Sequence, residues 1–124
     1  MAVMRFVVLL LLAISTAAEA QSMPVATFLA KADALKAKGA MALFSSDIGV
    51  LKREMQNAGL QLRAERQADI KAGRKASYCP PAKAALNSDE LISAMRAVPP
   101  ADRSRTPVKA VLRAHLIHKF PCPA

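Results

Sequence analysis

Two cysteines are the residues of this chain best suited to chemistry. Cys79 lies in a Tyr-Cys-Pro-Pro sequence, and Cys122 lies in a Phe-Pro-Cys-Pro sequence near the end of the chain. Redox-active pairs usually have Cys-x-x-Cys spacing, which is absent here. The two side chains are therefore either the halves of a structural disulfide or two free thiols, and the cellular compartment decides between these.

Histidine, serine and glycine offer little further chemistry. His115 and His118 are three residues apart, a spacing that can place two metal ligands on neighbouring faces of a helix. No cysteine or carboxylate lies close to them in sequence, so we expect core or surface roles and no metal site. No serine stands in a G-x-S-x-G context, and no glycine-rich phosphate loop occurs. We therefore predict no catalytic residues, no cofactor and no enzymatic activity.

Residues 1–20 have the pattern of a secretory signal peptide. Arg5 precedes an uninterrupted apolar run, which is followed by the small-residue site Ala18-Glu19-Ala20. The apolar run is shorter than the roughly 20 residues that span a bilayer. We therefore predict cleavage before Gln21 and export of a chain with no stable membrane anchor. An oxidising destination favours the disulfide over two free thiols.

The remaining residues, 21–124, have the length of one small domain. The chain has no Trp, one Tyr and four Phe, so its core must be aliphatic, which favours helices over strands. Its net charge is +9. Export and the scarcity of aromatic side chains argue against nucleic acid as a partner. The basic surface is either simply solvated or attracts an acidic partner protein or an anionic envelope surface.

The pattern of caps and apolar residues predicts an all-α fold, a small bundle of four to five helices stapled by one disulfide. We expect Ser22 to cap the first helix and Gly39 to end it. A short apolar piece at 41–44 is predicted to be helical and buried. The other predicted helices cover about 47–71, with a kink or break near Gly59, then 87–98, with an Asn87 and Glu90 capping box, and 106–120, with Thr106 as the N-cap.

The cysteines lie at the ends of the last two predicted helices. Cys79 precedes one and Cys122 follows the other, so antiparallel packing would bring the two together. A disulfide there would stabilise the domain by about 4 kcal/mol in the chain-entropy model.

Several of these features together resemble the Tai-type immunity proteins, including the resistance-associated proteins of the same fold. The residues that carry the resemblance are Tyr78, Cys79, Pro80, Phe120, Pro121 and Cys122. The resemblance implies a periplasmic all-helical protein with a disulfide and a tendency to form homodimers. It also implies a partner, a peptidoglycan amidase delivered by type VI secretion, which such proteins block by inserting into its active-site cleft.

Four exposed basic residues are our candidates for binding such a partner: Arg63, Arg66, Arg74 and Lys75. They precede Cys79, and their alternative role is that of a solvated face. Two functions remain open. The first is an immunity protein that inhibits a secreted amidase. The second is a structural or envelope-associated basic periplasmic protein with no toxin partner.

Overall fold

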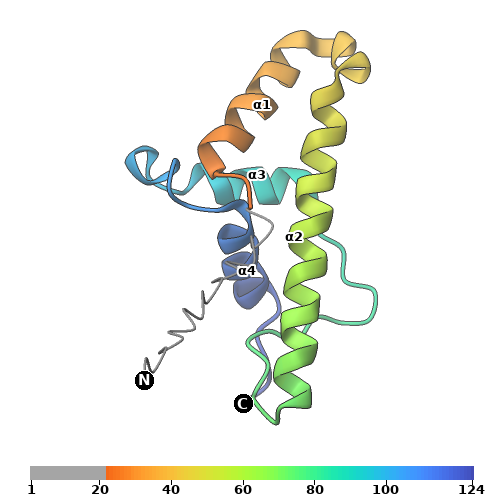
Figure 1. Ribbon diagram of the computed structural model, residues 1–124, viewed down its shortest axis with the longest axis vertical. Coiled ribbons are helices and arrows are strands. Elements are labelled where there is room, and N and C mark those ends of the chain that lie inside the picture. Colours follow the sequence, from red (N-terminus) through yellow and green to blue (C-terminus); the bar gives the residue numbers. More distant parts are fainter. Residues whose placement is uncertain (1–21) are drawn as a thin grey trace, which may run out of the picture.

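The computed structural model describes residues 22–124, and this part of the chain is helical with no strand. The predicted signal peptide, residues 1–20, lies outside the described residues. Four α-helices and two short 3₁₀-helices follow one another (Figure 1): α1 Val25–Lys38, η1 Gly39–Phe44, α2 Ser46–Lys71, α3 Ser88–Arg96, η2 Pro100–Asp102 and α4 Val108–Lys119. The prediction of a small all-α fold with a disulfide is confirmed for this region.

Helix α1 ends where the sequence predicts and begins differently. Gly39 ends it with φ 57°, a backbone conformation that glycine adopts without steric cost. Pro24 stands at the N-cap position, and no side chain caps the helix. The expectation that Ser22 caps α1 is therefore wrong. Its hydroxyl instead accepts a hydrogen bond from the Lys109 backbone N–H, 2.9 Å away, at the start of α4.

Helix α2 is a single helix of 26 residues, and the predicted break near Gly59 does not occur. The Ser45 side chain caps it by accepting a hydrogen bond from the Asp47 N–H. One glycine weakens a helix by only about 1 kcal/mol. Ala58 and Leu62, on either side of Gly59, are buried in the core, and this packing holds the helix together.

Helices α3 and α4 are positioned by their first residues. Asn87 and Glu90 form the predicted capping box at the start of α3. Pro107, rather than Thr106, stands at the N-cap of α4, so the predicted N-cap is one residue too early. The Thr106 hydroxyl donates instead to the Asp102 carbonyl, and the Thr106 carbonyl accepts a hydrogen bond from the Val25 N–H.

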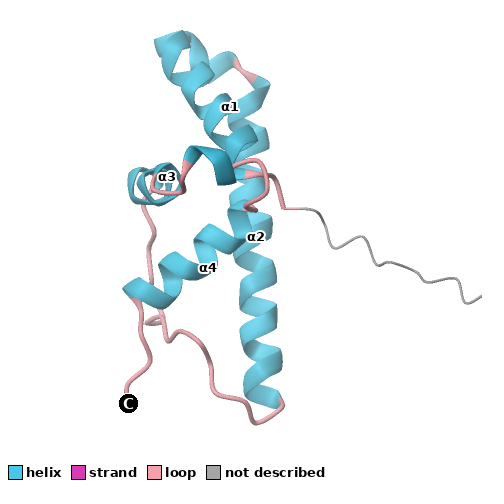
Figure 2. Cartoon of the chain, turned by 90° about the vertical axis from the view of Figure 1, so that its left-hand side faces the viewer, coloured by secondary structure: helices cyan, strands magenta, loops and turns pink. Residues whose placement is uncertain are grey.

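The core lies where the four helices meet, and α4 crosses the middle of α2 there (Figures 1 and 2). Each helix contributes aliphatic side chains to it, and the loop before α3 adds Tyr78. The buried residues are Val25, Phe28, Leu29, Ala58, Leu62, Tyr78, Leu91, Met95, Val108, Val111, Leu112 and Leu116.

The segment 41–44 contradicts the sequence prediction. It is helical, but it is exposed rather than buried, with Phe44 84% and Leu43 79% accessible. The physical reason is its position: it forms the turn between α1 and α2, at one end of the molecule, where no other element reaches it (Figure 1). In the described part of the chain, no helix combines the length and the hydropathy needed to cross a membrane.

Candidate binding surfaces

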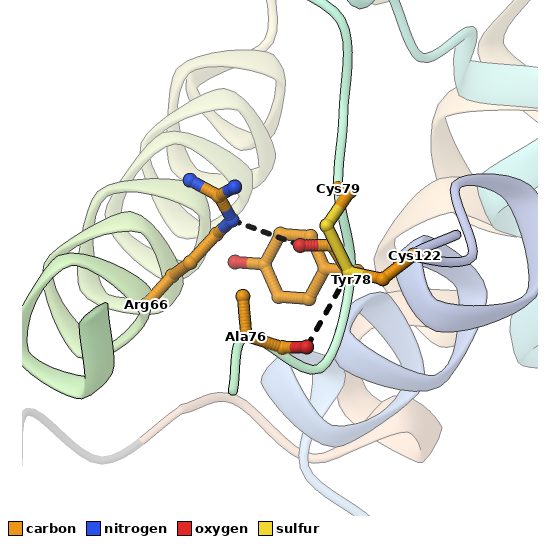
Figure 3. Close-up of a disulfide and its surroundings, with 5 residues drawn as sticks. All are labelled: Arg66, Ala76, Tyr78, Cys79 and Cys122. Atoms are coloured by element: carbon orange, nitrogen blue, oxygen red, sulfur yellow. Dashed lines mark hydrogen bonds between the residues drawn. A yellow bond between two sulfur atoms is a disulfide. The ribbon is translucent and has the colours of Figure 1, made fainter. Parts of the chain in front are cut away.

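The disulfide joins Cys79 to Cys122, with their Cα atoms 4.8 Å apart. The predicted pairing of the two cysteines is confirmed, but the antiparallel packing from which it was argued does not occur: α3 is seen end-on in Figure 2, whereas α4 runs across the view. The loop before α3 nevertheless lies beside the segment after α4. The Cys79 N–H donates to the Phe120 carbonyl over 2.8 Å, so the backbone pairs next to the sulfur bridge. Cys122 Sγ also lies 3.3 Å from the Ala76 carbonyl oxygen (Figure 3). An oxidised sulfur carries no hydrogen, so this approach is a contact without donation.

Tyr78 and Arg66 connect the disulfide to α2. The Tyr78 hydroxyl donates to the Leu62 carbonyl at 3.0 Å, and Arg66 Nε donates to the Tyr78 carbonyl at 2.8 Å (Figure 3). The Arg66 guanidinium also lies 5.9 Å from the centre of the Tyr78 ring, within cation–π range. Burial raises the pKa of Tyr78, so its hydroxyl stays protonated and remains a donor. We call Arg66, Tyr78, Cys79 and Cys122 the clasp.

The four basic candidates lie at one end of α2 and in the loop that follows it, but they fall into two pairs. Arg66 belongs to the clasp, and Arg74 forms an ion pair with Asp69 over 2.8 Å. Arg63 and Lys75 are exposed and make no ion pair within residues 22–124. Of the four candidates, Arg63 and Lys75 are therefore those whose charge remains available to an outside partner, and Lys71 at the end of α2 is also exposed and makes no ion pair within the described residues. The sequence could not separate the pairs, because Arg66 is recruited by a loop carbonyl twelve residues away.

An open apolar groove of about 570 Å³ runs between α1, α2 and α3. The sequence predicted the α2 side chains Ile48, Leu51 and Met55 as core, and the structure leaves them half-buried along this groove. The polar side chains of its lining are Lys52, Gln56 and Ser88, and no histidine or carboxylate stands among the lining residues. Such a lining is suited to contact with apolar surface. The apolar lining residues are Phe28, Ala32, Leu35, Ile48, Leu51, Met55, Leu86, Leu91, Ile92 and Met95.

The two histidines line a common shallow hollow between α3 and α4. His115 Nε2 is buried, lies 3.4 Å from Glu90 Oε1, and makes no hydrogen bond. Within residues 22–124, no group of three or more histidine, cysteine or carboxylate side chains is placed to hold a metal ion. Glu90 is also 2.7 Å from Lys119 Nζ, and this hydrogen bond lowers the pKa of its carboxyl. The cluster links the start of α3 to the end of α4.

Two further carboxylates join helices in the same way. Glu65 on α2 binds Lys109 and Arg113 on α4, and these contacts, that of Lys109 first, lower its pKa. Asp33 on α1 binds Arg96 on α3, whose guanidinium lowers the pKa of Asp33. Because these carboxylates form ion pairs between helices, they are not available to neutralise the remaining lysines and arginines on the surface.

Sequence reasoning missed the most exposed apolar feature, which is formed by Met41, Leu43 and Phe44 on η1. We call these three residues the apolar tip. The signal in the sequence was the position of 41–44 between a helix stop at Gly39 and a helix cap at Ser45. A connection this short between two helices forms the turn of a helical hairpin, where its side chains are exposed.

No family model, no curated protein and no solved structure matches this chain.

Proposed function

We propose that this chain is an exported, non-catalytic binding protein that inhibits a secreted peptidoglycan amidase. One observation carries the proposal: the six residues behind the resemblance to Tai-type immunity proteins come from two distant segments and lie together at one disulfide. A disulfide also suits the oxidising periplasm, to which we assign the protein.

The available positive charge gives the partner-binding surface. Arg63 and Lys75 form no ion pair with a carboxylate in residues 22–124, so their charge can attract an acidic active-site cleft. Arg66 and Arg74 hold the loop that presents Lys75. The open groove between α1, α2 and α3 offers apolar surface for the pairing of two copies, which the resemblance implies.

Inhibition is tested with residues 21–124, oxidised, and a peptidoglycan amidase encoded beside the gene. We expect stoichiometric loss of peptidoglycan hydrolysis. The double variant Arg63→Glu/Lys75→Glu should slow association at least ~10-fold, because rates steered by charge respond to charge reversal. The matched control is Lys36→Glu/Lys38→Glu, which makes the same charge change at the opposite end and should inhibit normally.

A survival assay tests the same proposal in cells. Bacteria that lack the gene should grow normally alone and die when a neighbour delivers the amidase. Unchanged survival, together with no inhibition in solution, would overturn the proposal and leave an envelope-associated protein without a toxin partner.

A further inference from the structure

The apolar tip projects from the end of the α1–α2 hairpin, at one extremity of the long axis of the molecule (Figure 1). Met41, Leu43 and Phe44 are 65%, 79% and 84% exposed. The segment that carries them, Gly-Ala-Met-Ala-Leu-Phe, contains no polar side chain. Exposed apolar residues gathered at one place usually mark an interaction site.

Positive charge surrounds the tip. Between residues 31 and 53, both carboxylates are neutralised by ion pairs, Asp33 with Arg96 and Asp47 with Lys31. Four cations in this stretch form no ion pair within the described residues: Lys36, Lys38, Lys52 and Arg53. Lys38 contacts only the Ser45 hydroxyl, at 3.3 Å, and Lys36 and Lys38 directly precede the tip.

The composition of the tip discriminates between a protein and a membrane as its partner. Protein interfaces are enriched in aromatic residues, Met and Arg, are depleted in Lys and Ala, and carry about one hydrogen bond per 100–200 Å². Met41 and Phe44 would suit either partner, so the discrimination rests on two other features: the cations nearest to the tip in sequence are lysines, and the tip has no side chain that could form hydrogen bonds. Apolar side chains next to lysines are what anionic lipid surfaces bind, because the apolar groups insert while the ammonium groups meet phosphates.

We propose that the apolar tip docks on an anionic phospholipid bilayer. Met41, Leu43 and Phe44 insert among the headgroups, and Lys36 and Lys38 lie against the lipid phosphates. Insertion is superficial, because three side chains on one turn reach only the boundary between headgroups and acyl chains. The docking is independent of amidase inhibition, since Arg63 and Lys75 belong to the second half of α2 and the loop after it, whereas the tip precedes the first turn of α2.

Co-sedimentation with vesicles tests the insertion of the tip. The oxidised protein should bind vesicles that contain phosphatidylglycerol and bind phosphatidylcholine vesicles far more weakly. Leu43→Ser/Phe44→Ser should reduce the partition coefficient at least ~10-fold, because two large apolar side chains lose their burial in lipid. The matched control is Leu60→Ser, which changes a 64% exposed leucine in the middle of α2 and should bind normally. All these positions are exposed, so circular dichroism should show an unchanged helix content.

The contribution of charge to vesicle binding is tested with the same two double variants as the inhibition assay, and the variant expected to show the larger effect is the other one. Lys36→Glu/Lys38→Glu should weaken vesicle binding at least ~10-fold, and Arg63→Glu/Lys75→Glu should weaken it much less. The two proposals therefore fail separately. Lack of wild-type binding to anionic vesicles, or equal loss in Leu60→Ser, would overturn membrane docking. Loss of amidase inhibition or of self-association in the tip variant, without vesicle binding, would assign the tip to a protein partner instead.

Discussion

The two ends of this molecule differ in the range of the contacts that hold them and in the burial of their aromatic residues. At the clasp, a disulfide, a buried tyrosine and an arginine join segments that are far apart in sequence. At the apolar tip, the contacts are local: the Ser45 N–H donates to the Ala42 carbonyl, and Lys38 reaches the Ser45 hydroxyl. The aromatic residue of the clasp, Tyr78, is 7% exposed, whereas that of the tip, Phe44, is 84% exposed.

This difference separates what holds the fold from what is available for recognition. Long-range contacts raise the free energy needed to open a region, and local contacts leave it close to freely fluctuating. Side chains at the tip can therefore change with little effect on unfolding, and those at the clasp cannot. The following predictions test this division, beginning with the largest expected effect.

Removal of the disulfide should cause the largest loss. In Cys79→Ala/Cys122→Ala, we expect the free energy of unfolding to fall by about 4 kcal/mol, because the unfolded chain regains the freedom of a long loop. Urea unfolding of the variant and of the oxidised protein measures the change. Hydrogen exchange should accelerate around residues 76–79 and stay as before at 39–44. A loss below about 1 kcal/mol would show that the clasp does not dominate stability.

A pair of aromatic truncations compares the two ends directly. Tyr78→Ala should cost about 3 kcal/mol, since it leaves a cavity and removes the hydrogen bond to Leu62. Phe44→Ala should change stability by no more than about 0.5 kcal/mol, because the ring is exposed. Thermal unfolding of both variants gives the comparison. Similar losses for the two would contradict the division between the ends.

Two arginine-to-alanine variants distinguish an arginine that stabilises the fold from one whose charge is available to a partner. Arg66→Ala should destabilise the protein by about 1–2 kcal/mol, because the half-buried Tyr78 carbonyl loses a charged donor. Arg63→Ala, one turn earlier on α2, should be neutral for stability and weaken only partner association. Urea midpoints and association rates measure the two effects. If Arg63→Ala lowered the free energy of unfolding, Arg63 would also have a structural role.

Lowering the pH should have the smallest effect on the free energy of unfolding, and this effect should come from several carboxylates on different helices. The pKa of Glu65 and that of Glu90 lie below the usual value of 4.5, and that of Asp33 lies below 3.8, each because of a cation on another helix. A lowered pKa in the folded state means that stabilisation is complete above the unfolded value and is lost as pH falls through the folded one. Unfolding free energies should therefore decrease below about pH 4.5.

Glu65→Gln is the control for the acid effect. It should cost less than about 1 kcal/mol at neutral pH, because Glu65 is largely exposed, and it should flatten the acid dependence. An unchanged slope in this variant would show that its ion pairs with α4 contribute nothing to the acid response.

Most helix boundaries could be predicted because the signals for them are local. Asn87 and Glu90 cap α3, Ser45 caps α2, and Gly39 ends α1, and each acts on the backbone within a few residues. The disulfide was also predictable, since the chain has two cysteines and a predicted export signal, although the antiparallel packing of α3 and α4 that was expected to bring the cysteines together does not occur.

What could not be predicted depends on distant parts of the chain. Apolar residues at 41–44 indicate burial only if another element covers them, and none does. Arg66 is a structural residue because the loop at Tyr78 returns to α2, and local sequence contains no sign of this. The same holds for Ser22, whose hydroxyl binds Lys109 at the start of α4 and does not cap α1. Thr106 differs, because the partner of its hydroxyl, Asp102, is only four residues away.

The pairing of the first described residues with the start of α4 has a consequence for the order of folding. Val108 N–H donates to the Met23 carbonyl, Val25 N–H donates to the Thr106 carbonyl, and Pro24 forms a β-bridge with Pro107. These bonds join positions separated by most of the chain, so they close late and raise the contact order of the fold. During synthesis, which starts at the N-terminus, residues 22–25 therefore remain without their hydrogen-bond partners until the start of α4 has also been synthesised.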